Sequence, residues 1–149
     1  MDPDGRARPA TMPIRDRVAV ALNAAERVMP VLALQPYTAK LLGPALADAR
    51  RWQRGGAVPA GRLYGHIHPL REAAEDDELA GRELAACCAV VYALYYATWQ
   101  ARREEGPVGR PLPNDICDIT EDTLGECLAY AARVEASAEP DAAADRPRD

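Results

Sequence analysis

One long apolar segment, residues 79–101, most constrains what this chain can fold into. From Leu84 to Trp99 every residue except Thr98 is apolar. A helix that is apolar on all sides is a buried helix, either in a protein core or in a membrane. The run is shorter than the roughly 20 apolar residues that a bilayer requires, and its aromatic residues do not mark two interfaces. The segment therefore predicts the central helix of a soluble helical domain.

The two faces of this predicted helix differ in the size of their side chains. Placed at about 100° per residue, the large side chains share one broad face, formed by Leu84, Cys87, Cys88, Val91, Tyr92, Leu94, Tyr95 and Trp99. The opposite face is almost entirely alanine, at positions 85, 86, 89, 93 and 97. We expect the alanine face to admit a neighbouring helix closely. We expect the large face to fill the core, with buried side chains at Leu84, Val91, Tyr95 and Trp99.

Further helices are predicted from apolar periodicity and from the proline and glycine residues that interrupt it. Their ranges are 13–29, 36–54, 59–68 and 114–134, the last beginning at Asn114, a good N-cap. The sequence thus predicts an all-α fold of about five helices in one domain, residues 13–136. The proline-rich and charged segments 1–12 and 137–149 are expected to be disordered tails.

Three local features set the predicted boundaries. Gly43-Pro44 is expected to kink or divide the helix at 36–54, because proline removes a backbone hydrogen bond. Pro69 is expected to break or kink the helix at 59–68 for the same reason. The acidic run 75–78 is expected to open the central helix, where carboxylates complement the positive end of the helix dipole.

The chain carries a formal net charge of −5, and this charge is divided unevenly. Residues 1–70 hold ten basic and five acidic side chains, whereas residues 71–149 hold eight basic and 18 acidic ones. Such asymmetry indicates either a charged partner or attraction between the two halves of one fold. A protein binds nucleic acid mainly by neutralising phosphates with basic side chains. Because this chain is acidic overall, we expect no nucleic acid as a partner. We also expect no membrane as a partner.

Four cysteines, at positions 87, 88, 117 and 127, favour a reducing compartment. Three of them lie in apolar helical patterns, where free cysteine behaves as a small hydrophobic residue. Adjacent Cys87 and Cys88 point about 100° apart on a helix, which suits a disulfide poorly. Four free thiols and a cytoplasmic location are therefore expected.

Residues that usually carry chemistry are scarce. Ser137 is the only serine, and it falls in the predicted C-terminal tail, which disfavours serine catalysis. His66 and His68 are two residues apart and point to different faces of a helix, unlike a helical zinc pair. They suit a surface pair or a partner for a buried carboxylate. No Cys-x-x-Cys pair, phosphate loop or Glu-x-x-His motif occurs, so we expect no metal, no cofactor and no enzymatic activity.

Two charged features remain as candidate sites. The first consists of Glu26-Arg27 together with the group Asp48, Arg50, Arg51 and Arg54. These charged side chains are either solvated, paired with one another across helices, or part of a functional site. The second is an acidic stripe on the last predicted helix, formed by Asp115, Asp118, Asp122 and Glu126. These carboxylates repel one another at helical spacing. The stripe is either a solvated face or a docking surface for a basic partner.

Four short segments, taken in order, resemble small all-helical immunity proteins of bacterial polymorphic toxin systems. They are AAERVMP at 24–30, ARRW at 49–52, PNDI at 113–116 and TED at 120–122. The resemblance covers about residues 15–135 and departs from the pattern at Gly43-Pro44 and Pro69. It implies a protein that neutralises a toxin by binding it, and it supplies no catalytic residues to transfer.

The function expected from the sequence is stoichiometric binding of a cognate toxin, which an acidic protein would favour if the toxin is basic. One alternative is a structural or regulatory homodimer, which a large exposed apolar patch would favour. Another is an enzyme that uses carboxylates and arginines around Glu26-Arg27, which a strongly shifted carboxyl pKa would favour.

Overall fold

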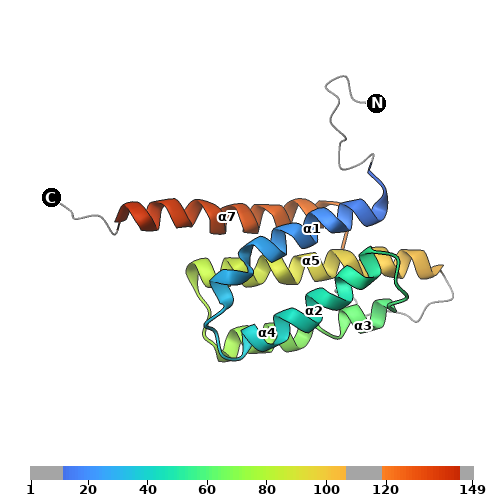
Figure 1. Ribbon diagram of the computed structural model, residues 1–149, viewed down its shortest axis with the longest axis horizontal. Coiled ribbons are helices and arrows are strands. Elements are labelled where there is room, and N and C mark those ends of the chain that lie inside the picture. The colour runs from blue at the N-terminus through green and yellow to red at the C-terminus, as the bar shows by residue number, and fades with distance from the viewer. Residues whose placement is uncertain (1–11, 107–118, 145–149) are drawn as a thin grey trace, which may run out of the picture.

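The structure is a computed structural model that describes residues 12–106 and 119–144, with side chains as far as residue 136. These parts of the chain are helical and contain no strand, which confirms the all-α prediction (Figure 1). The elements in order are α1 (Ile14–Val28), the 3-10 turn η2 (Met29–Leu32), α2 (Thr38–Gln53), α3 (Ala60–Tyr64), α4 (Ile67–Asp76), α5 (Gly81–Glu105) and α7 (Asp122–Ala144).

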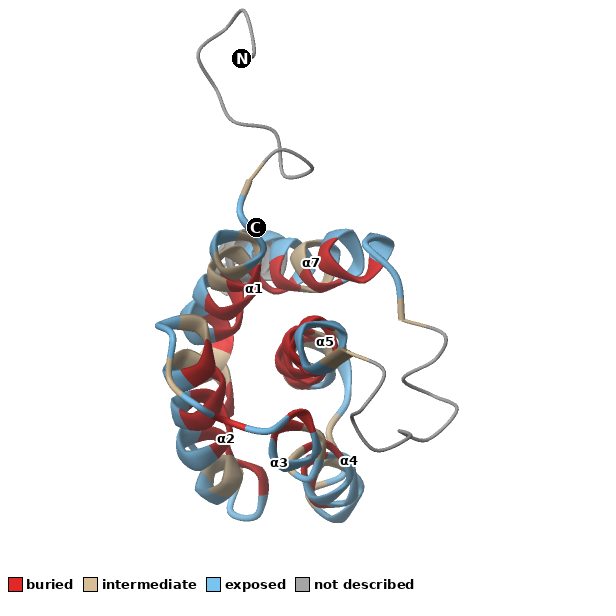
Figure 2. Cartoon of the chain, turned by 90° about the vertical axis from the view of Figure 1, so that its right-hand side faces the viewer, coloured by how far each residue is buried: buried red, intermediate tan, exposed pale blue. Residues whose placement is uncertain are grey.

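Helix α5 lies at the centre of the fold. Seen along its axis in Figure 2, it has α1 and α7 on one side, α2 on another, and α3 and α4 below. The length argument against a membrane span is wrong, because α5 has 25 residues and is long and apolar enough to cross a bilayer. Its residues are nevertheless mostly buried among the other helices, as in the core helix of a soluble protein.

The alanine face of α5 packs closely against its neighbours, as predicted. Ala89, Ala93 and Ala97 are fully buried. The thiol of Cys127 on α7 lies 3.3 Å from the carbonyl oxygen of Ala89 and 3.8 Å from that of Ala21 on α1. The small alanine side chains on this face permit the close approach of α7.

The large face of α5 only partly fills the core, so the prediction for it is half wrong. Val91 and Tyr95 are buried, but Trp99 is half-buried and Leu84 is 43% exposed. Both faces of α5 are apolar, so hydrophobicity alone does not choose the buried one. The neighbouring helices come closest on the alanine side, which leaves part of the large face at the surface.

Helices α2 and α4 differ from their predicted bounds. Gly43 and Pro44 lie inside α2, which runs without a break from Thr38 to Gln53. Pro69 lies in the first turn of α4, where its missing N–H needs no partner. The acidic run that was expected to open the central helix instead closes α4 and forms the following turn.

A reversal of the chain between α4 and α5 ties two distant segments together. Glu78 and Gly81 adopt positive φ angles of 52° and 56°. The carboxylate of Asp77 accepts hydrogen bonds from the backbone N–H groups of Tyr37, at 3.2 Å, and Thr38, at 2.8 Å. Asp77, which directly follows the last residue of α4, therefore caps the N-terminus of α2.

The last helix begins later and ends later than predicted. Residues 119–121 are not helical, so the helix starts at Asp122, while the expected N-cap Asn114 lies outside the described residues. The backbone of α7 continues to Ala144, through residues expected in the C-terminal tail. The start has a physical cause, because the hydroxyl of Thr120 accepts from the N–H of Asp122 at 3.2 Å and the hydroxyl of Thr123 accepts from the N–H of Thr120 at 3.3 Å. This reciprocal arrangement is a helix cap.

Candidate protein-binding surface

A groove lies along the part of α5 that its neighbours leave uncovered. It has a volume of about 540 Å³ and is bounded on one side by α4. We call it the α5 groove. Its lining residues are Arg71, Ala74, Glu75 and Glu78 from α4 and the turn after it, Leu79, and Leu84, Cys87, Cys88, Val91, Tyr92 and Tyr95 from α5.

The floor of the α5 groove is a strip of apolar side chains at helical spacing. Leu84, Cys88 and Tyr92 follow one another every fourth residue, and all three are at least partly exposed. Leu84 is one of the few large apolar side chains that the described part of the chain leaves exposed. Burying such a strip against a partner is favourable by about 25 cal/mol per Å² of apolar surface removed from water.

A row of aromatic rings crosses this floor from α7 toward α4. The rings of Tyr130 and Tyr92 meet edge to face at a centroid distance of 5.2 Å, and those of Tyr92 and Tyr95 lie 6.3 Å apart. Arg71 donates a hydrogen bond of 3.2 Å to the hydroxyl of Tyr95. Desolvation, and then the neighbouring Tyr130, raise the pKa of Tyr92. The row is therefore an uncharged, rigid surface at neutral pH.

Carboxylates lie on the α4 side of the α5 groove and on the neighbouring face of α7. Glu75 and Glu78 belong to its α4 side. Glu126 on α7 lies close enough to contribute, after desolvation and Tyr130, to the raised pKa of Tyr92. Among the residues that the structure describes, none forms an ion pair with these three carboxylates.

The acids of α4 occupy the unfavourable end of that helix. The residues 75–78 lie at its C-terminus, whose last turn contains no basic side chain. Carboxylates there meet the negative end of the helix dipole, which costs about 0.3–1 kcal/mol for each exposed charge. Asp77 is compensated by the backbone N–H groups that it caps. Glu75 and Glu78 have no such compensation and face the groove.

Two of the four residues of the predicted acidic stripe lie in the described part of the chain. Asp122 and Glu126 are exposed on α7, opposite its buried side chains. Asp115 and Asp118 lie outside the described residues. Along α7, Asp122 and Glu126 share a face with Tyr130 and Arg133, because these positions repeat at helical spacing. The contact of Tyr130 with Tyr92 places this face beside the α5 groove.

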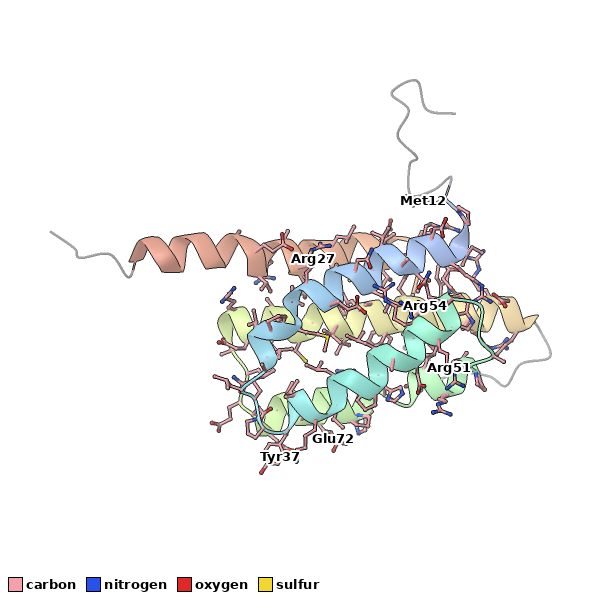
Figure 3. The ribbon with its side chains drawn as sticks, viewed as in Figure 1. Met12, Arg27, Tyr37, Arg51, Arg54 and Glu72 are labelled. Atoms are coloured by element: carbon pink, nitrogen blue, oxygen red, sulfur yellow. The ribbon has the colours of Figure 1, made fainter. Side chains whose placement is uncertain are left out.

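The arginine-rich surface lies on the other side of the molecule, between α1 and α2. Arg50 donates two hydrogen bonds to the carboxylate of Glu26, at 2.7 and 3.0 Å. This hydrogen bonding lowers the pKa of Glu26. Arg27 pairs with Glu135 of α7 at 3.1 Å. Figure 3 shows Arg51 and Arg54 at the end of α2, where both are exposed.

This second surface fits cross-helix pairing better than acid–base catalysis. A general acid at neutral pH needs a raised carboxyl pKa, and Arg50 moves the pKa of Glu26 the other way. The two helices are joined through this pair, and the remaining arginines line a shallow, basic depression of about 670 Å³.

Two polar clusters, of which only the first is centred on a buried carboxylate, join helices through contacts that the sequence does not reveal in full. The buried Asp48 accepts a hydrogen bond from Arg62 at 2.9 Å and lies 2.7 Å from Nε2 of His66. This confirms the expected pairing of a histidine with a buried carboxylate, whereas His68 pairs with Glu72 at the surface.

The second cluster is built around Glu121, just before α7. The carboxylate accepts hydrogen bonds from Tyr96, at 3.2 Å, and from Gln100, at 2.8 Å, and it pairs with Arg17 of α1 at 2.5 Å. Glu121 thus joins α1, α5 and the start of α7. These three partners lie 21 or more positions away, so no local pattern could have indicated them.

In the ranges that the structure describes, no three of His, Cys, Asp and Glu gather as metal ligands would. No family model, no curated protein and no solved structure matches this chain. Among the surfaces of the described residues, the α5 groove combines exposed apolar side chains with carboxylates that have no ion pair there.

Proposed function

We propose that this protein acts by stoichiometric binding of another protein, as an immunity protein that neutralises a basic toxin. One observation carries the proposal: the central helix is buried on its other sides, yet Leu84 is exposed and Cys88 and Tyr92 are partly exposed along the α5 groove. Exposed apolar surface that is rimmed by polar residues is typical of protein–protein interfaces.

The charges around the groove support a basic partner. Glu75 and Glu78 line it, Glu126 lies on the neighbouring face of α7, and none of the three has an ion pair in the described ranges. The chain as a whole has a net charge of −5. Opposite charge accelerates the encounter of two proteins and favours one orientation of docking. A toxin that acts on nucleic acid would be basic in any case, because it must bind the phosphates of its substrate.

The mode of action needs no chemistry on the part of this chain. A protein that covers the working surface of a toxin only has to bind tightly and remain bound. The resemblance to helical immunity proteins, at residues 24–30 and 49–52 in particular, is consistent with this role.

The exposed strip also favours a second candidate, a homodimer formed through the α5 groove. A symmetric dimer would place the same apolar side chains of two copies face to face. It would also place the acidic rims of the two copies near each other, which costs free energy. The charge of the rims is the reason to prefer a different, basic partner.

Site-specific photocrosslinking tests the proposed function. A photoreactive phenylalanine derivative is introduced at Tyr92, in the groove, and separately at Tyr37, which is 52% exposed but lies outside it. The full chain is expressed in its native cells, irradiated, and its crosslinked products are identified by mass spectrometry. We expect one basic protein to be captured from position 92 and not from position 37.

The captured protein must then form a one-to-one complex and lose its toxic activity when one equivalent of this chain is added. Capture of a second copy of this chain alone would establish the homodimer instead. A captured protein that remains fully active in the complex would overturn the immunity function while leaving the binding surface in place.

A further inference from the structure

We infer that the α5 groove receives an amphipathic α-helix of the partner, with apolar side chains on one face and basic side chains along both edges. This inference rests on the proposed function and adds the shape and charge of what is bound. Its basis is the form of the exposed strip together with the carboxylates on its two sides.

The shape of the strip matches a helix. Its partly or fully exposed side chains recur every fourth residue, at Leu84, Cys88 and Tyr92, so the strip follows α5 at a slant of about 26° to the helix axis. The groove floor from Leu84 to Tyr95 is about 16 Å long, at 1.5 Å per residue. A partner helix of about three turns covers that length, and its side chains at i, i+3, i+4 and i+7 would meet the floor.

The position of the groove also matches a helix. In Figure 2, α7 lies above α5 and α4 lies below it, while α1 and α2 cover the opposite side. A helix seated in the groove would lie on α5 and beside α4. The row Tyr130, Tyr92 and Tyr95 would form the base on which it rests.

The charges select a basic helix over a neutral one. Glu75 and Glu78 lie on the α4 rim, where the helix dipole makes them unfavourable. Glu126 on α7 does not line the groove but lies one turn from Tyr130, whose ring meets that of Tyr92. The two nearby cations are already engaged with aromatic side chains, Arg71 with the hydroxyl of Tyr95 and Arg133 with the ring of Tyr130. Lysine or arginine on both edges of the bound helix would therefore find carboxylates on both sides.

Selection from an unbiased library tests this inference without knowledge of the natural partner. The full chain is used as bait for phage-displayed random peptides of about 16 residues, a length that spans the strip as a helix. We expect the enriched peptides to carry apolar residues at helical spacing and a surplus of lysine and arginine. Circular dichroism of the bound peptides is expected to show a gain of helix.

Matched variants locate the binding. Leu84→Asp should weaken binding of the enriched peptides by about tenfold or more, whereas Leu34→Asp, at a leucine that is 91% exposed and outside the groove, should not. On α4, Glu75→Lys should weaken binding, whereas Glu72→Lys should have little effect. Glu72, labelled in Figure 3, is exposed on the same helix but does not line the groove.

Each other outcome overturns the inference. Absence of enrichment, enrichment of acidic or extended peptides, or equal sensitivity to Leu84→Asp and Leu34→Asp would do so. Self-association that requires Leu84 would show that a second copy occupies the groove. A natural partner that crosslinks at Tyr92 through a loop or strand would leave the proposed function intact and refute the helix alone.

Discussion

Asp48 shows how a single buried carboxylate joins α2 to the helices that follow it. Its hydrogen bond with His66 lowers its pKa, burial opposes this shift, and the hydrogen bond from Arg62 adds to the lowering. Both partners lie within one turn of each other, in α3 and just before α4. The ionised form of Asp48 is therefore the one that the folded protein stabilises.

We expect Asp48→Asn to lower the free energy of unfolding by about 1–3 kcal/mol near pH 7, because charge-assisted hydrogen bonds are lost. A carboxyl with a lowered folded pKa stabilises the fold above its unfolded pKa, about 3.9, and this contribution disappears as the pH falls through the folded pKa. Urea denaturation should therefore show the gap between wild type and variant narrowing below about pH 4. A gap of constant size would show that the charge of Asp48 is immaterial.

The cysteines differ in reactivity because they differ in burial. Burial raises the pKa of Cys87 and of Cys127 to about 12, so little thiolate is present to react. Cys88 is half-buried on the floor of the α5 groove; burial raises its pKa, while Arg133 and Arg71 oppose the rise. We expect iodoacetamide to modify Cys88 well before Cys87 and Cys127 in the native protein, as read by peptide mass spectrometry. Denaturation without reductant should release four free thiols, and equal native rates at the three positions would contradict the packing.

At the scale of the element, the two faces of α5 should differ in how well they tolerate a change of side-chain size. Ala89 is fully buried against the thiol of Cys127, whereas Leu84 is partly exposed. We expect Ala89→Leu to destabilise the fold by about 1–3 kcal/mol through overpacking. Leu84→Ala, on the same helix, should change stability by less than about 1 kcal/mol. Chemical denaturation measures both, and a neutral Ala89→Leu would mean that no helix lies close to that face.

Trp99 is a third position on α5, with an intermediate environment. Its ring is half-buried and lies 4.6 Å from the guanidinium of Arg103. Its truncation should therefore cost less than the roughly 3–5 kcal/mol of a fully buried tryptophan.

Apolar periodicity predicts where the helices lie better than it predicts which of their faces are buried. The apolar run at residues 79–101 identifies α5, because no other soluble structure buries such a segment so readily. It does not identify the buried face, since alanine and tyrosine both count as apolar. Pro69 predicts a break or kink, yet proline is tolerated in the first turn of a helix. For this reason the sequence did not predict α4, and the acids at 75–78 were expected at the start of α5 and not at the end of α4.

The candidate site was predictable only in part, for a related reason. The exposed carboxylates of α7 follow from their spacing in the sequence. The groove beside them does not, because it depends on where α4 and α7 lie around α5. The Asp48 and Glu121 clusters likewise depend on contacts between residues that are 14 to 104 positions apart.

At the scale of the whole molecule, charge is separated between two sides. The groove side carries carboxylates that form no ion pair among the described residues, while arginines are gathered between α1 and α2. A basic partner should approach the groove side, and its association rate should fall as salt screens the attraction over a Debye length of about 10 Å at 0.1 M.

We expect Glu126→Lys to slow association with a basic toxin more than Asp122→Lys does, because Glu126 lies one turn, and Asp122 two turns, from Tyr130, which contacts Tyr92 in the groove. Both side chains are exposed, so neither substitution should unfold the protein. Stopped-flow kinetics at two ionic strengths, with Asp16→Lys on α1 as a control, measures the rates. Unchanged rates at low salt would mean that the acidic face of α7 is only solvated, and binding would have to be sought on the arginine-rich α2.

The acidic end of α4 has a consequence for the free protein. Glu75 and Glu78 oppose the dipole of their own helix, so the unbound chain is locally frustrated at the rim of its groove. Glu75→Lys should therefore raise the free energy of unfolding of the isolated protein by about 0.3–1 kcal/mol while it weakens the complex. Thermal denaturation and binding measured on the same variant would show the two effects together, and a variant that is less stable alone would contradict the argument. Stability given up in isolation and regained on binding is the trade-off by which a protein keeps a surface ready for a partner.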